Sequence, residues 1–190
     1  MTERKWVKDV LTKRLEDAQR EGALPNGLTL QPEQRLPYAF EIPSYSGDGQ
    51  KGGVLSPRTD TKSYAIDLLI GEWTGAKSWN PRVAVEVKLQ INTHSVITYS
   101  QKAADHRAVS PYLRYGMLAV GFATLPWRLL RHGSHFDFMI RCGTGLPDSE
   151  LRDLADLVYQ EVEASRRLEA VLYKSPKQKT TLLHRSLTLD

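Results

Sequence analysis

The stretch Pro81-Arg82-Val83-Ala84-Val85-Glu86-Val87-Lys88-Leu89-Gln90 has the alternation of a half-buried β-strand. One face carries Val83, Val85, Val87 and Leu89, and the other carries Ala84, Glu86, Lys88 and Gln90. A carboxylate and an ammonium group in the middle of so apolar a run both lose water when the strand is buried. This cost indicates that Glu86 and Lys88 have a role beyond packing.

A second apolar run, Tyr64-Ala65-Ile66-Asp67-Leu68-Leu69-Ile70, carries one acidic residue at its centre. Two neighbouring strands therefore interrupt their hydrophobic pattern with charge. We interpret Asp67, Glu86 and Lys88 as one site. An isolated Glu-x-Lys on a strand is more often a solvated face, but Asp67 in the preceding strand favours the functional reading.

The residue types of this site suit metal-dependent phosphodiester hydrolysis. Carboxylates of Asp67 and Glu86 can hold Mg²⁺, a hard cation that prefers oxygen ligands, and the backbone carbonyl of Val87 is a further ligand. Such a metal lowers the pKa of bound water, and Mn²⁺ is a possible substitute. Lys88 can stabilise the attacking hydroxide or the charge on phosphorus.

Length and composition place the chain among globular proteins with one domain. The chain has 190 residues, of which 41% are hydrophobic and 25% are charged. No window approaches 18 uninterrupted apolar residues, so we expect no membrane partner. The charged amino terminus and a single cysteine, Cys142, favour a cytoplasmic location. A net charge of +4 is compatible with a polyanionic partner.

Periodicity and turn residues predict the order of the elements. We expect a helix over 3–21, strands over 36–42, 64–70 and 81–90, a helix over 95–109 beginning at a Ser95 cap, strands over 115–123 and 136–140, and a helix over 147–173. Residues 43–63 predict a loop or, alternatively, a long irregular hairpin, and 71–81 predict a turn region. The expected fold class is α/β, with a mixed central β-sheet flanked by helices.

Asp67, followed after eighteen residues by Glu86-Val87-Lys88, resembles the motif of the PD-(D/E)XK nuclease superfamily. That superfamily includes type II restriction endonucleases, a mismatch-repair nicking enzyme and archaeal Holliday-junction resolvases. Ile66 stands where the family has proline. The resemblance covers about residues 3–123. It implies a restriction endonuclease-like core, with 1–190 forming a single nuclease domain that ends in a C-terminal helix and polar tail, 147–190.

Many members of the superfamily add a further acidic residue from the first helix or the first strand. Glu41 is the first candidate, because it interrupts an apolar strand as Asp67 does. Asp17 and Glu21, near the packing side of the first helix, are the alternatives.

Candidate contacts with DNA come from two segments. The predicted loop offers Lys51, Arg58 and Lys62. The helix over 95–109, where members of the superfamily often place a polar side chain, offers Tyr99, Gln101 and Lys102.

Two other patterns favour structural or surface roles. The spacing of His94, His106, His132 and His135 matches no compact zinc motif. Gly47-x-Gly49-x-x-Gly52 lacks the strand before it and the helix after it that a dinucleotide-binding turn requires.

The resemblance implies a Mg²⁺-dependent endodeoxyribonuclease acting on double-stranded DNA, with a type II restriction endonuclease-like enzyme as the first hypothesis. Since one site cuts one strand, double-strand cleavage favours a homodimer. The alternatives are a nicking repair, resolvase or transposition-type nuclease, and a non-catalytic DNA-binding module that retains the fold. RNA is not favoured, because no aromatic platform for a single strand is apparent in the sequence.

Overall fold

The structure is a computed structural model, which describes residues 1–47 and 53–174. Its elements are α1 (Glu3–Trp6), η1 (Val7–Thr12), α2 (Lys13–Arg20), β1 (Leu28–Ser46), β2 (Ser56–Trp73), β3 (Trp79–Lys88), α3 (Thr93–Val109), β4 (Arg114–Val120), α4 (Trp127–His132), β5 (Phe138–Cys142), α5 (Asp148–Glu169) and η2 (Ala170–Lys174). Segment η1 is a π-helical stretch that joins α1 and α2 into one helical run. Lys51 and the predicted polar tail from residue 175 lie outside the described residues.

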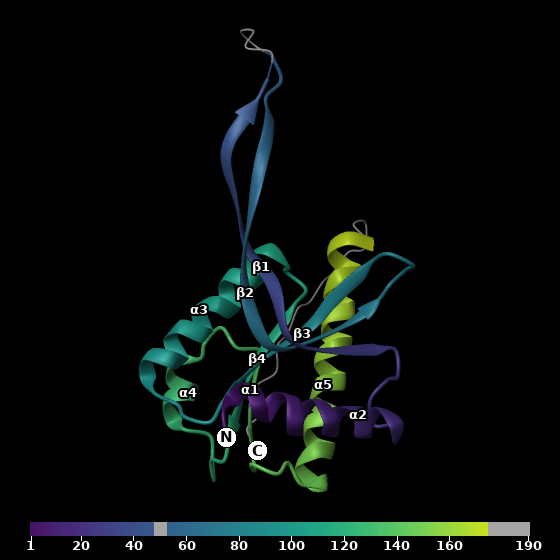
Figure 1. Cartoon of the computed structure of the whole chain (residues 1–190), viewed down its shortest axis with the longest axis vertical. Helices are drawn as coiled ribbons and strands as arrows, with labels where there is room; N and C mark the ends of the chain where they lie inside the picture. Colours follow the sequence, from purple (N-terminus) through teal and green to yellow (C-terminus); the bar gives the residue numbers. More distant parts are fainter. Residues whose placement is uncertain (48–52, 175–190) are drawn as a thin grey trace.

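Five strands form one mixed sheet in the order β1-β2-β3-β4-β5 (Figure 1). The first three strands pair antiparallel, whereas β3, β4 and β5 pair parallel. Helix α3 makes the connection that lets β4 run parallel to β3. The predicted mixed sheet with flanking helices is therefore confirmed.

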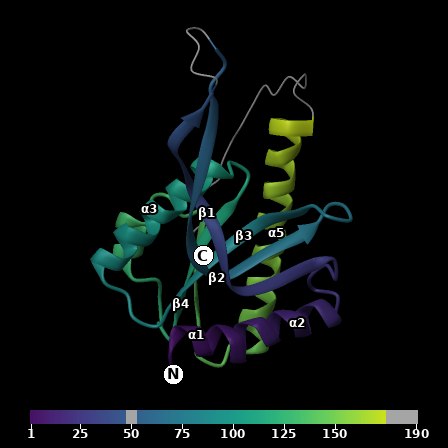
Figure 2. The ribbon, with the colours of Figure 1, turned by 45° about the horizontal axis from the view of Figure 1, so that its top comes forward.

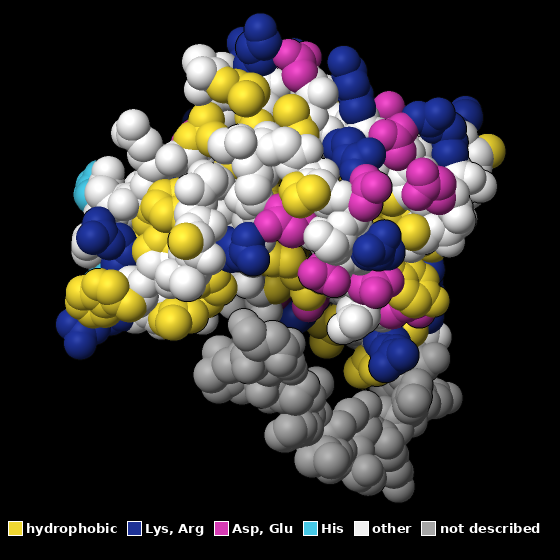
Figure 3. Space-filling model, turned by 90° about the horizontal axis from the view of Figure 1, so that it is seen from below, with side chains coloured by type: hydrophobic (Ala, Val, Ile, Leu, Met, Phe, Trp, Pro, Cys, Tyr) yellow, Lys and Arg dark blue, Asp and Glu magenta, His cyan; other side chains and the backbone are white. Residues whose placement is uncertain are grey.

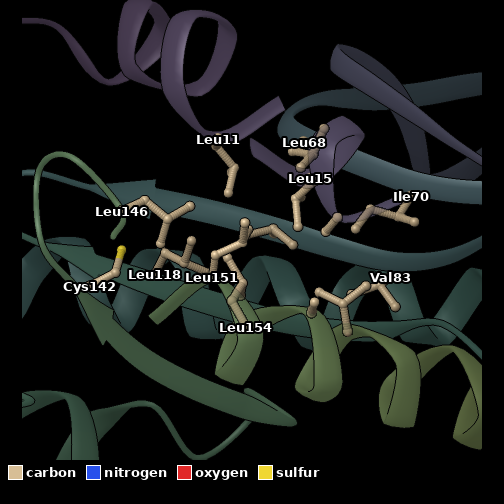
Figure 4. Close-up of a cluster of buried hydrophobic side chains, with 14 of the residues drawn as sticks. Leu11, Leu15, Leu68, Ile70, Val83, Leu118, Cys142, Leu146, Leu151 and Leu154 are labelled. Carbon is tan, nitrogen blue, oxygen red and sulfur yellow. The ribbon is translucent and has the colours of Figure 1, made fainter. Parts of the chain in front are cut away.

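Helices cover both faces of the sheet, as Figures 1 and 2 show. The amino-terminal helical run and α5 pack on one face, and α3 and α4 pack on the other. The first face buries a cluster that includes Leu11, Leu68, Val83, Leu118 and Leu154 (Figure 4). Because side chains alternate along β3, Glu86 and Lys88 point to the opposite face, toward α3.

The capping of α3 differs from the expectation by one turn. Asn92 is the N-cap, and its side chain accepts a hydrogen bond from the backbone N–H of Ser95 at 2.8 Å. Ser95 returns the contact by accepting from the Asn92 N–H at 3.2 Å, which forms a capping box. Ser95 was thus correctly placed at this helix start, but as the third helical residue rather than the cap.

Strands β1 and β2 are much longer than predicted, and the segment over 43–63 is largely a hairpin rather than a loop. Glu41 pairs with Asp60, and Ser46 pairs with Ser56. Register shifts occur between Pro37 and Ala39 and between Glu41 and Ser44, so the hairpin is irregular, as the alternative reading stated. We call residues 39–46 and 56–62 the arm; it extends well beyond the sheet (Figures 1 and 2). The residue pattern does not predict this strand because Ser56–Ser63 has no alternating apolar residues; the strand is defined by its backbone pairing with β1.

The predicted turn region over 71–81 is also mostly strand. Trp73 pairs with Trp79, so the turn is limited to residues 74–78. The Thr74 N–H donates to the Ser78 carbonyl at 2.8 Å. Within the described ranges, no helix combines the length and the apolar character needed to cross a membrane.

Candidate active site

Asp67 lies where β2 and β3 separate. Leu68 and Val85 form the last pair of the ladder on this side. Beyond this pair, a side chain replaces the backbone as the hydrogen-bond acceptor: Asp67 Oδ2 accepts a hydrogen bond from the Val87 N–H at 2.8 Å. The Asp67 side chain is 26% exposed, so it lies at the boundary between the buried sheet and solvent.

Glu86 lies next to Asp67 but is only 2% exposed. Its Oε1 accepts a hydrogen bond from the hydroxyl group of Tyr115 at 2.6 Å. Burial, followed by the charge of the Asp67 carboxylate, raises the pKa of Glu86 to about 8. A carboxyl group whose pKa is raised by a neighbouring carboxylate belongs to a site that a bound cation would stabilise.

Lys88 joins this pair from the same strand as Glu86. Its Nζ lies 2.9 Å from Glu3 Oε2, 3.7 Å from Asp67 Oδ2 and 4.1 Å from the centre of the Tyr99 ring. Burial by itself lowers the pKa of Lys88, but the Asp67 charge and the hydrogen bond to Glu3 more than offset this, so its pKa lies above its usual range. Lys88 is therefore a buried cation held between two carboxylates.

The sequence predictions missed Glu3, the first residue of α1. Besides its contact with Lys88, the Glu3 carboxylate accepts from the Leu89 N–H at 3.3 Å. The only signal in the sequence is an acidic residue in the first turn of a helix, which is usually explained by the helix dipole. Its place beside Lys88 depends on how the amino-terminal helix crosses the sheet.

Glu41 does not join the site, and this prediction is wrong. It lies on the arm, where its 60% exposed side chain pairs with Lys62 at 3.2 Å. Its partner in the ladder is Asp60, seven residues before Asp67 along β2, which is about 23 Å of extended strand. The interrupted apolar pattern that suggested Glu41 reflects an arm with no core beneath it.

The alternative acidic residues of the first helix are also away from the site. Asp17 pairs with Arg14 and Arg20 on the helix surface. Glu21 borders a shallow cleft of about 300 Å³ between α2 and α5, on the other face of the sheet.

The predicted DNA contacts separate into two groups. Arg58 and Lys62 lie on the arm, and Lys62 is paired with Glu41 and Asp60. Gln101 donates to Asp105 at 2.8 Å on the exposed side of α3. Lys102 lies nearer the site, because its Nζ is 4.5 Å from the centre of the Tyr99 ring, which Lys88 also contacts.

The donor set fits a hard divalent cation. Within residues 1–47 and 53–174, no cluster of three or more His, Cys, Asp or Glu side chains has the geometry of a metal site. Mg²⁺, however, is usually bound by one or two carboxylates, with water and substrate phosphate oxygens completing its shell. Asp67 and Glu86 supply two carboxylates, and the Val87 carbonyl stays a predicted ligand.

In the part of the chain that the structure describes, no histidine joins these carboxylates in a group of metal ligands. His94 and His135 are exposed, whereas His106 is buried beneath the site. His106 Nδ1 lies 2.9 Å from the Pro37 carbonyl oxygen, and its ring stacks on Tyr115 at 5.6 Å. Burial lowers the pKa of His106, so it is a neutral packing residue behind Tyr115.

On one broad face of the molecule, Lys and Arg side chains are interspersed with Asp and Glu (Figure 3). This face therefore has no continuous positive stripe of the kind that follows a DNA backbone. Comparison with protein-family models finds no match for this chain, and comparison with curated proteins finds none either.

Proposed function

We propose that this protein is a Mg²⁺-dependent endodeoxyribonuclease with a restriction endonuclease-like core of the PD-(D/E)XK type. The observation that carries the proposal is the convergence of Asp67, Glu86 and Lys88 at the point where β2 and β3 separate. A buried carboxylate beside a second carboxylate is costly for stability alone. Such a pair is typical of a site that binds a cation.

Each side chain has a distinct role in the proposed reaction. Asp67 and Glu86 would hold Mg²⁺, which supplies Lewis-acid stabilisation of the phosphate and a more acidic water. Tyr115 fixes the orientation of Glu86 through the hydrogen bond to Oε1. Lys88 donates hydrogen bonds to the phosphate oxygen on which negative charge accumulates as water attacks phosphorus and the bond to the leaving oxygen breaks.

Glu3 acts through Lys88 and is a positioning residue. Its carboxylate holds the Lys88 ammonium group at 2.9 Å, while Asp67 lies further away at 3.7 Å. Fixing the ammonium group before substrate binds lowers the cost of ordering it during the reaction.

The first specific form that we propose is a cytoplasmic, type II restriction endonuclease-like homodimer that cuts both strands of double-stranded DNA. The second form is a nuclease that nicks or trims DNA of irregular structure. Tyr38 and Tyr64, which stack with ring centres 4.0 Å apart next to the arm, favour this second form, because unpaired bases can stack on exposed aromatic rings.

The test is incubation of the purified protein with supercoiled plasmid and bacteriophage DNA in Mg²⁺, in Mn²⁺ or in EDTA. Asp67→Asn keeps an acceptor for the Val87 N–H but removes the charge, and Lys88→Ala removes the ammonium group. Each should reduce cleavage by at least about 100-fold while DNA binding persists. Lys13→Gln, on the exposed surface of α2, is the matched control and should cleave like the wild type.

The products distinguish the proposed forms. Discrete metal-dependent fragments identify a sequence-specific endonuclease, and nicking alone identifies the second form. Binding without cleavage of either DNA under any metal condition would contradict the enzymatic proposal and leave a non-catalytic DNA-binding module.

A further inference from the structure

Three tyrosines that are far apart in the sequence are linked between the candidate site and the arm, two by a ring stack and the third through Lys102. We call Tyr38, Tyr64 and Tyr99 the tyrosine surface; all three are half-buried. The rings of Tyr38 and Tyr64 stack with centres 4.0 Å apart and planes 8° apart. His106 of α3 supports both rings edge-on, at 6.2 Å and 6.0 Å. The tyrosine surface therefore lies on the α3 face of the sheet, the face to which Glu86 and Lys88 point.

Lys102 places a positive charge on this surface. Its Nζ lies 4.5 Å from the centre of the Tyr99 ring and 4.7 Å from the centre of the Tyr64 ring. Among the described residues, it forms no salt bridge with a carboxylate, unlike Lys62 or Lys88. A lysine held against two aromatic rings without an acidic partner is available to an anion.

The tyrosine surface is continuous with the site. Lys88 Nζ lies 4.1 Å from the centre of the same Tyr99 ring that Lys102 contacts. One tyrosine thus separates the ammonium group that would act on the cleaved phosphate from a second ammonium group. Two cations beside one ring suit neighbouring phosphates of a nucleic-acid strand.

The arm carries exposed apolar side chains of its own. The register shift between Pro37 and Ala39 interrupts the alternation of β1, so Phe40 pairs with Thr61, three residues from Tyr64 along β2. The Phe40 side chain is 56% exposed, and that of Ile42 is 48% exposed. Exposed apolar side chains therefore lie along the two-stranded arm, and α3 runs beside the base of this arm (Figure 2).

We propose that the tyrosine surface and Lys102 bind an unpaired stretch of a DNA strand next to the phosphate that is cut. This inference rests on the proposed nuclease function for the identity of the strand. Unpaired bases offer free faces for stacking on aromatic rings, whereas the bases of an intact duplex are stacked on one another. Lys102 takes a neighbouring phosphate, and the tyrosines take the adjoining bases, so the substrate is a flap, a bubble or a single strand.

The test compares binding of a fluorescent oligothymidylate with binding of a mixed-sequence duplex of equal length. Binding is measured by fluorescence anisotropy in the presence of EDTA, which removes divalent metal and so prevents cleavage. The wild type should bind the single strand more tightly than the duplex. Tyr64→Leu and Tyr38→Leu should each weaken single-strand binding by about tenfold to 100-fold, whereas Tyr64→Phe should retain it. Tyr159→Leu, at a 45% exposed position on α5, is the control for loss of a surface ring.

Salt dependence tests the role of Lys102 independently of the rings. Lys102→Gln should reduce the slope of log affinity against log salt by about 0.7 for the single strand, because one phosphate contact is lost. Lys13→Gln should leave the slope unchanged. Thermal unfolding of every variant separates loss of binding from loss of folding.

Equal or tighter binding of the duplex by the wild type would overturn the proposal. Wild-type affinity for the single strand in folded Tyr64→Leu and Lys102→Gln proteins would overturn it as well. Failure of the proposed nuclease function would give another result. Single-strand binding would still depend on Tyr64 and Lys102, but no DNA would be cleaved.

Discussion

Replacing Glu86 by glutamine tests the electrostatics of the site without reference to its substrate. Glutamine has nearly the shape of a protonated glutamic acid and can still accept the hydrogen bond from Tyr115. The substitution removes a group that burial and the Asp67 carboxylate hold largely in its neutral form at pH 7. We therefore expect Glu86→Gln to stabilise the protein at alkaline pH.

The sign and the pH range follow from the pKa of Glu86, which burial raises from 4.5 to about 8. Between these values the native state retains a proton that the unfolded chain has released. The contribution of Glu86 to the free energy of unfolding is therefore fully present below pH 4.5 and is lost as the pH rises toward 8. The loss is about 1.4 kcal/mol per pH unit, to a ceiling of about 5 kcal/mol.

The assay is urea unfolding of the wild type and Glu86→Gln at intervals from pH 5 to pH 9. The difference in the free energy of unfolding should be small at pH 5 and should grow in favour of the variant up to about pH 8. His106, whose pKa is lowered by burial, titrates with the opposite sign in this range. It is present in both proteins and cancels in the difference. Parallel pH profiles for the two proteins would refute the reasoning.

Mg²⁺ provides a second measurement on the same pair of proteins. A metal that binds the ionised form of Glu86 must displace its proton, so binding strengthens as the pH rises. Mg²⁺ should therefore raise the melting temperature of the wild type more at pH 8 than at pH 6. It should have little effect on Glu86→Gln, and an equal Mg²⁺ effect on both proteins would contradict a role of Glu86 in metal binding.

Three further predictions concern the interior. Glu169→Ala should lower the free energy of unfolding, measured in urea, by about 3 kcal/mol. The reason is that Arg82, which is 1% exposed, loses one of its carboxylate partners, which lies 2.8 Å away. An effect below about 1 kcal/mol would contradict this prediction. Gly116→Ala should cost about 1–3 kcal/mol, since an added Cβ would lie 2.3 Å from the Phe138 ring, and Phe138→Leu in the same chain should recover part of the loss. The Cys142 thiol, whose pKa burial raises to about 12, should react with an aromatic disulfide reagent at pH 8 only after unfolding; rapid labelling of the native protein would show that it is accessible.

The sequence by itself predicted the central residues of the candidate site. Strand alternation shows which side chains share a face, so a charge that breaks an apolar run is visible without a structure. This reasoning identified Asp67, Glu86 and Lys88, and the structure brings these three together. The spacing of apolar residues also predicted the helices and the mixed sheet, because each helix or strand carries its own apolar stripe with its own period.

The same reasoning failed where a segment has no core beneath it. Glu41 interrupts an apolar run as Asp67 does, but its run belongs to the arm, on which Phe40 and Ile42 are exposed. Local alternation shows that a strand has an apolar face but not what covers that face. Only the register of the long β1–β2 pairing places Glu41 about seven residues from the site along the sheet.

Tertiary structure alone decided the surroundings of the site. Glu3 contacts Lys88 across 85 positions of the chain. Tyr38 of β1 stacks on Tyr64 of β2, and Lys102 of α3 lies close to the rings of both Tyr64 and Tyr99. Contacts between distant segments depend on how strands pair and where helices cross the sheet, and these features leave no period in the sequence. The chain's residue pattern therefore determined the acidic pair and its lysine, while the fold decided what holds the lysine and what lies beside it.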